Sequence, residues 1–198
     1  MSVTQDTLEN LFISKVRIKA LRYFLMNPET EIHLRGAVRE FKEEINAVRR
    51  ELSRLEEAKI IASTNKGNRK YFELNGDHPF VTELIGICHK SFGLGAEILD
   101  NVKKIGNIEF ALLTPSYTRG IFLNMQIIDM VIVGDIDLKV LEDIVNKCQT
   151  KLSKEIHYMV LKSAEFQLRK RRRDQLMLDL LMQDNVLLIG NRDSLVKF

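Results

Sequence analysis

The 198-residue sequence has no tryptophan, only two cysteines and only three prolines, and no apolar run of membrane-spanning length. Cys88 and Cys148 lie far apart, outside any CxxC pair, so neither a disulfide framework nor a zinc site is expected. The polar start, MSVTQDT, does not resemble a secretory signal. These absences favour a cytoplasmic protein with reduced thiols, no membrane partner, and no metal or other cofactor.

Composition predicts a globular protein with two small domains. Apolar residues make up 45% of the chain and charged residues 29%, so each half can bury a core. The net charge of +3 is too small to indicate a partner, since the local clustering of charge matters more for nucleic-acid binding.

The N-terminal third has the pattern of a winged helix-turn-helix domain, expected over residues 1–76. The spacing of apolar residues predicts three helices, over residues 8–26, 34–41 and 44–60. The period then changes to two, and the predicted strands flank Asn65-Lys-Gly-Asn, a hairpin signal. Helix, helix, turn, helix and hairpin in this order predict a domain that binds duplex DNA.

The third helix is the predicted recognition helix. If its apolar face, with Ile45, Val48, Leu52 and Leu55, packs inward, the opposite face carries Asn46, Arg49, Arg50, Ser53 and Arg54. Arginine can pair with guanine and asparagine with adenine in the major groove. This pattern makes Asn46, Arg49 and Arg50 the expected base-reading residues.

Further basic side chains are expected to hold the DNA backbone. Those of the hairpin are Lys66, Asn68, Arg69 and Lys70, and those of the second helix are Arg35 and Arg39. The alternative is that all these side chains are simply solvated. Glu43 and Glu44 open the recognition helix and repel phosphate, and Glu51, Glu56 and Glu57 dilute its charge. One copy is therefore expected to bind weakly, which favours a homodimer on duplex DNA or a small set of operators.

The second half predicts an α/β domain over residues 105–198, joined to the first by a long linker helix over 77–104 that Asp77 caps. Gly93 and Gly95 weaken the middle of this helix. Strands are expected over residues 108–113, 126–133, 156–161 and 186–189, with Gly134 ending the second. Helices are expected from Asp137 to Lys151 and from Ser163 to Met182. The fold class is therefore mixed α+β.

Four segments carry a resemblance to a known family: RRELSRLEEAKII, NGDHPF, IDMVIVGDIDLKVLEDIV and VLLIGNRDSL. With them, nearly the full chain resembles prokaryotic ArsR-like winged-helix regulators fused to a nucleotidyltransferase-like domain. In active members, a Gly-Ser loop binds nucleotide phosphates. An Asp-x-Asp pair and a third carboxylate bind two magnesium ions, which clamp the reacting oxygens.

This chain departs from that pattern at each point. Ser116 and Gly120 match the loop, but Pro115 stands where the first glycine is expected. Ile127 replaces the first aspartate and leaves Asp129 alone, and the later strand has no internal carboxylate. We therefore expect Ser116, Gly120 and Asp129 to be a vestigial nucleotide site without catalysis. Asp135 and Asp137 are expected in a turn and a helix cap.

One strong run of positive charge lies on the last predicted long helix, at Arg169, Lys170, Arg171, Arg172 and Arg173. One interpretation is a solvated face paired with Glu165 and Asp174. The other is a second patch for phosphate, RNA or protein.

The sequence thus predicts a sequence-specific transcriptional regulator whose second domain is not an enzyme and serves for oligomerisation or ligand sensing. One alternative is an active nucleotidyltransferase acting on a protein or small molecule. Another is an antitoxin-like adaptor with a protein partner.

Overall fold

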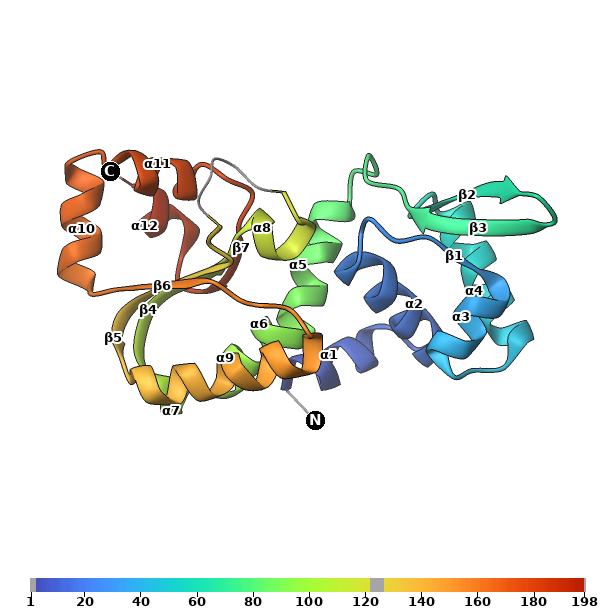
Figure 1. The fold of residues 1–198 in the computed structure, drawn as a ribbon, viewed down its shortest axis with the longest axis horizontal. Coiled ribbons are helices and arrows are strands. Elements are labelled where there is room, and N and C mark those ends of the chain that lie inside the picture. The colour runs from blue at the N-terminus through green and yellow to red at the C-terminus, as the bar shows by residue number, and fades with distance from the viewer. Residues whose placement is uncertain (1–2, 122–126, 198) are drawn as a thin grey trace. The chain divides into compact units, whose positions relative to one another are not determined.

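The computed structural model describes residues 3–121 and 127–197 and has a mixed α+β fold (Figure 1). The chain divides into two compact units, an N-terminal unit, Met1–Ser91, and a C-terminal unit, Phe92–Phe198. Each unit has its own sheet. None of the helices in the described ranges is both long and apolar enough to span a membrane.

The N-terminal unit follows the predicted order of elements. It consists of α1 (Val3–Leu11), α2 (Lys15–Met26), β1 (Ile32–His33), α3 (Leu34–Phe41), α4 (Ile45–Glu57), β2 (Ile61–Lys66), β3 (Arg69–Leu74) and α5 (Val81–Ser91). The strands form an antiparallel sheet in the order β1-β3-β2. In β2 and β3, Lys66 pairs with Arg69, which leaves a two-residue turn at Gly67 and Asn68. Gly67 takes a positive φ of 60° there, which glycine adopts without steric cost.

Local caps define the tight turn between α3 and α4. The Nδ1 atom of His33 accepts a hydrogen bond from the Gly36 amide at the start of α3. Lys42 ends that helix in the left-handed conformation, with φ 54°. The Glu44 carboxylate then accepts hydrogen bonds from the amides of Asn46 and Ala47 and begins α4. The two helices are therefore separated by only three residues.

Burial of one face fixes the rotation of α4 about its own axis. Val48, Leu52 and Leu55 are buried, as expected, and α4 contacts α2, α3 and β2. Ile45 was expected to face the core with them, but it is 37% exposed because it is the first residue of the helix. The fourth buried side chain of α4 is instead Glu51.

The first helix is shorter than predicted. The expected helix over 8–26 is two helices, because the Ser14 hydroxyl accepts a hydrogen bond from the Arg17 amide and caps a new helix at Lys15. Ile13 precedes this cap and is almost fully exposed. The end of α2 agrees with the prediction, since Asn27 follows Met26 as its C-cap.

The C-terminal unit alternates helices and strands. Its elements are α6 (Gly93–Asp100), α7 (Val102–Ile105), β4 (Gly106–Leu113), α8 (Pro115–Arg119), β5 (Met130–Ile136), α9 (Leu138–Leu152), β6 (Tyr158–Leu161), α10 (Ser163–Arg171), α11 (Gln175–Leu181), β7 (Val186–Ile189) and α12 (Arg192–Val196). The sheet order is β6-β5-β4-β7, in which only β5 and β6 are parallel.

Both faces of this sheet are covered. Alternate residues of β5 enter two separate apolar clusters: Met130 and Ile132 one, and Val131 and Val133 the other. The first cluster includes side chains of α6 and α9, and the second includes Phe166 of α10 and Met177 of α11. This confirms the two-sided burial that the apolar run predicted.

Several predicted boundaries are wrong. The linker helix expected over 77–104 is α5, α6 and α7, because Phe92 is extended, Gly93 has φ 66° and Asn101 departs from helical geometry. Asp77 does not cap it, since α5 begins at Val81. The helix expected over 163–182 breaks where Arg173 has φ 52° and Asp174 caps α11.

The second strand also differs from the prediction. It begins at Met130 and continues through Gly134 to Ile136, so Asp135 lies in the strand and not in a turn. Gln126, the predicted start, lies outside the described residues. Asp137 caps α9 as predicted, by accepting from the amides of Lys139 and Val140.

Gly134 lies where β5 crosses closest to β4. Its φ is 148°, and a Cβ atom there would overlap the carbonyl oxygen of Asn107. The register of the β4–β5 pair shifts nearby, between Ile108 and Phe110. Glycine is therefore required for both its conformation and its lack of a side chain.

We expect Gly134→Ala to lower the free energy of unfolding by about 2 kcal/mol or more, because the new methyl group must displace backbone. Gly86→Ala is the control, since nothing lies within 4 Å of a Cβ on this α5 residue. It should raise the stability by roughly 0.5–1 kcal/mol. Urea unfolding measures the stability of both variants. Equal changes in stability would contradict the close approach of Gly134 to Asn107.

Candidate functional site

The predicted base-reading face of α4 is exposed. Asn46, Arg49, Arg50, Ser53 and Arg54 all lie on the surface, opposite the buried face of the helix. The side-chain oxygen of Asn46 accepts a hydrogen bond from Arg49 Nη1 at 3.0 Å. The pair holds two of the predicted base-reading side chains together near the start of α4.

A groove of about 540 Å³ runs between α3, α4 and the β2–β3 hairpin. We call it the basic groove. Its lining includes six of the predicted DNA-binding residues: Arg35, Arg49, Ser53, Asn68, Arg69 and Lys70. Its other lining residues are His33, Leu34, Leu52 and Phe72. The structure thus brings together residues of three elements that the sequence pattern alone assigned to one function.

The remaining predicted residues lie outside the lining of the groove. Asn46, Arg50 and Arg54 are on α4, Arg39 is on α3 and Lys66 is near the hairpin turn. No described carboxylate lies within 4 Å of the guanidinium of Arg35, Arg39, Arg50 or Arg69. These four arginines are available for an anionic partner.

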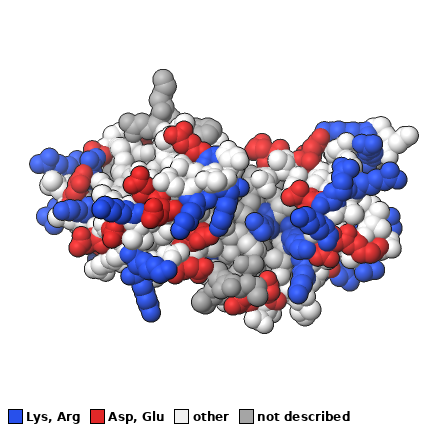
Figure 2. Space-filling view, turned by 60° about the horizontal axis from the view of Figure 1, so that its bottom comes forward, with Lys and Arg blue, Asp and Glu red and all other residues white. Residues whose placement is uncertain are grey.

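Three other cations of the set are already paired. Lys66 Nζ lies 2.5 Å from Glu31, Lys70 Nζ lies 2.7 Å from Glu56, and Arg54 Nη1 lies 3.0 Å from Glu51. Acidic and basic side chains are accordingly interspersed on the face drawn in Figure 2. The surface is mixed rather than uniformly positive.

Both acidic residues at the start of α4 contact groups of the N-terminal unit. Hydrogen bonds from the amides of Asn46 and Ala47 lower the pKa of Glu44, and the charges of Arg50 and Arg49 add to this effect. Glu43 lies 2.6 Å from Lys19 of α2. Both carboxylates therefore have partners within the unit.

Glu51 has a structural role that the sequence did not predict. It was expected only to reduce the positive charge of α4. Its side chain is 7% exposed and accepts hydrogen bonds from Arg17 Nε of α2 and from Arg54. Burial alone would raise the pKa of Glu51, but hydrogen bonds from Arg17 and Ser14 and the two arginine charges lower it overall. The i,i+3 spacing from Arg54 was visible in the sequence, whereas the contact with Arg17 was not.

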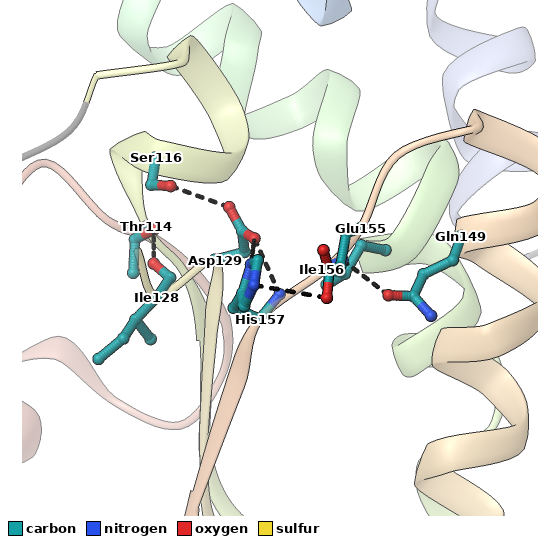
Figure 3. Close-up of polar contacts among 8 residues, drawn as sticks. All are labelled: Thr114, Ser116, Ile128, Asp129, Gln149, Glu155, Ile156 and His157. Carbon is teal, nitrogen blue, oxygen red and sulfur yellow. Dashed lines mark hydrogen bonds and ion pairs between the residues drawn. The ribbon is translucent and has the colours of Figure 1, made fainter. Parts of the chain in front are cut away.

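In the C-terminal unit, the expected vestigial residues Ser116 and Asp129 meet (Figure 3). Asp129 directly precedes β5 and is 1% exposed. Its Oδ1 accepts from Ser116 Oγ at 2.9 Å, and its Oδ2 accepts from the His157 amide at 2.9 Å. Gly120 ends the short helix α8 with φ 67° and is not part of this cluster.

The cluster has the donor set of a structural link rather than of a metal site. The His157 ring lies beside it, with Nδ1 at 3.6 Å from Asp129 Oδ2 and Nε2 at 3.7 Å from the Glu155 carboxylate. Ile127, at the expected first aspartate position, is exposed and cannot ligate an ion. Across the described residues, no three His, Cys, Asp or Glu side chains are grouped to hold a metal.

The five basic side chains of residues 169–173 lie in different environments. Lys170 is 3% exposed, and its Nζ donates to the carbonyls of Ser194 and Leu195 on α12, so it is not part of a surface patch. Burial lowers the pKa of Lys170. Arg169 pairs with Glu165 at 2.8 Å. Only Arg171, Arg172 and Arg173 face outward.

Both cysteines are buried thiols, as the sequence indicated. Burial raises the pKa of Cys88 to about 12 and also raises that of Cys148. Neither is a reactive thiolate at neutral pH.

Comparisons with known proteins do not place the chain in a family. No family model matches it, and no curated protein matches it. One similar solved structure is reduced HlyU from Vibrio cholerae N16961, with 13% identity and a TM-score of 0.35 over 45% of this chain and 88% of that chain. The nucleotidyltransferase-like part of the resemblance has no support from these comparisons.

We expect Asp129→Ala to lower the free energy of unfolding by about 2–4 kcal/mol, because the Ser116 hydroxyl and the His157 amide lose their acceptor. Asp129→Asn is the matched control, since its amide keeps the shape and one oxygen acceptor. It should cost less than half as much in chemical denaturation. If Asp129→Ala is as stable as the wild-type protein or more stable, the carboxylate does not stabilise the fold.

Proposed function

We propose that the protein is a sequence-specific regulator of transcription that binds duplex DNA through a winged helix-turn-helix formed by α2, α3, α4 and the β2–β3 hairpin. The observation that carries this proposal is the basic groove. It joins the exposed face of α4 to the hairpin through a hollow lined by Arg35, Arg49, Arg69 and Lys70. If α4 lies in the major groove, a hollow of this kind can hold the neighbouring DNA strand where it passes the hairpin.

Each part of the interface has a distinct task. Arg49, Arg50 and Asn46 at the start of α4 read base edges: an arginine donates two hydrogen bonds to guanine, and asparagine donates one to adenine N7 and accepts one from its amino group. Arg35, Arg39 and Arg69 hold phosphates on either side, because guanidinium groups match phosphate oxygens in geometry and charge. Leu34 and Phe72 in the groove contact the sugars or thymine methyl groups of the strand.

We further propose that the C-terminal unit has no nucleotidyltransferase activity. The only aspartate left from the expected pair is buried and already accepts two hydrogen bonds, and Pro115 occupies the first position of α8, where close approach of a phosphate to backbone amides was expected. Oligomerisation or ligand sensing by this unit, a homodimer on DNA and a protein partner stay predictions from the sequence.

Arg50→Ala should weaken specific binding by about 1–3 kcal/mol, because Arg50 is exposed early in α4 and no described carboxylate lies within ion-pair distance of its guanidinium. The duplex for this measurement is first selected from a random library with the wild-type protein. Fluorescence anisotropy at fixed salt then gives the affinities, since salt changes them strongly.

Arg192→Ala is the control, because it removes the same exposed side chain from α12 of the C-terminal unit. It should bind the selected duplex within about twofold of the wild-type protein. Wild-type affinity of Arg50→Ala would contradict the assignment of α4. Failure of the wild-type protein to bind any duplex at low salt would refute the proposed function itself.

A further inference from the structure

Two lysines of the β2–β3 hairpin are held by carboxylates of the same unit, whereas the neighbouring arginines are not. Lys66 Nζ donates to Glu31, which precedes β1, at 2.5 Å. Lys70 Nζ donates to Glu56, in the last turn of α4, at 2.7 Å. Arg69, between the lysines in sequence, has no such partner among the described carboxylates.

An aromatic ring adds to each contact. Lys66 Nζ lies 5.6 Å from the ring centre of Tyr71, and Lys70 Nζ lies 5.2 Å from that of Phe72. A cation over an aromatic face is attracted by the ring, so each ammonium group has two stabilising contacts in the free protein. Both lysines thus have contacts along the hairpin, although their side chains stay 56% and 47% exposed.

Of the two carboxylates, Glu56 has more contacts with the hairpin. It also accepts a hydrogen bond from the Ser63 hydroxyl of β2, at 2.5 Å, so it contacts both strands of the hairpin. Hydrogen bonds from Lys70 and Ser63 lower the pKa of Glu56. The pKa of Lys66 is raised, chiefly by its hydrogen bond to Glu31. These shifts favour the charged forms of Glu56 and Lys66.

We propose that Glu31 and Glu56 compete with DNA phosphates for Lys66 and Lys70, so that these carboxylates limit the affinity of the basic groove for DNA. This inference rests on the proposed function. A phosphate that approaches either lysine must displace the carboxylate or share the ammonium group with it, and in both cases the carboxylate lies close to the phosphate and repels it. Lys70 lines the groove, so its release bears directly on the bound strand.

Neutral glutamine in place of either glutamate should therefore strengthen binding. Glu56→Gln keeps an oxygen acceptor for Ser63 but frees Lys70, and we expect the Kd for a mixed-sequence duplex to fall about two- to fivefold. The slope of log Kd against log salt should steepen by about 0.9 for each lysine that gains a phosphate. Glu31→Gln should act in the same way through Lys66.

Matched controls separate this competition from a general change of charge. Glu57→Gln changes the adjacent residue of α4, and Glu29→Gln changes a residue close to Glu31; both glutamates are exposed and neither has an ion pair with a described residue. These two variants should alter the Kd by less than half of the change seen for their neighbours. Thermal unfolding of all four variants confirms that each is folded.

A double-mutant cycle gives the decisive result. In the Lys70→Ala background, Glu56→Gln should no longer strengthen binding, because the lysine that it would free is absent. Equal gains with and without Lys70, or equal gains for Glu57→Gln, would overturn the proposal.

Two further outcomes are informative. Weaker binding by folded Glu56→Gln would also overturn it, since Glu56 would then position the hairpin for DNA. Absence of DNA binding by the wild-type protein and by every variant would instead refute the proposed function, so the two failures are distinguishable.

Discussion

The burial of one face of α4 against α2, α3 and β2 determines what the N-terminal unit can offer to a partner. Val48, Leu52 and Leu55 account for the apolar part of this face, and the buried contact between Glu51 and Arg17 adds a polar one. A helix held in this way can present only its opposite face to a partner. That face carries three arginines and one asparagine, and the hairpin that follows closes a groove beside it. The proposed interface is therefore a consequence of how the core packs.

Charge compensation is the second constraint. Glu31, Glu51 and Glu56 pair with three of the cations that we predicted to contact DNA, while four arginines have no described carboxylate within ion-pair distance. Exposed ion pairs of this kind contribute little to stability, typically below about 1 kcal/mol each. Their main effect is on the electrostatic potential of the surface. The proposed interface combines arginines that have no described carboxylate within ion-pair distance with lysines that already contact a carboxylate. Its affinity for DNA should therefore depend on geometry as well as on net charge.

Local signals in the sequence were enough for much of the fold. The hairpin at Gly67, the cap at Asp137 and the two-sided burial of β5 all depend on residues near in sequence. The exposed face of α4 also followed from its apolar period. The breaks at Ser14, Phe92 and Arg173 were missed because single caps and backbone angles override a continuous helical pattern. The partners of Lys66 and Lys70 and the contact of Asp129 with His157 were missed because they join residues 14 to 35 positions apart.

The central claim is that the N-terminal unit binds duplex DNA between α4 and the β2–β3 hairpin. Amide hydrogen exchange of the full chain, with and without a mixed-sequence duplex at low salt, tests it most directly. Bound DNA should slow exchange at the turn before α4 and at Gly67 and Asn68, which adjoin the proposed interface. Unchanged exchange throughout the N-terminal unit at saturating DNA, or protection confined to Phe92–Phe198, would contradict the claim.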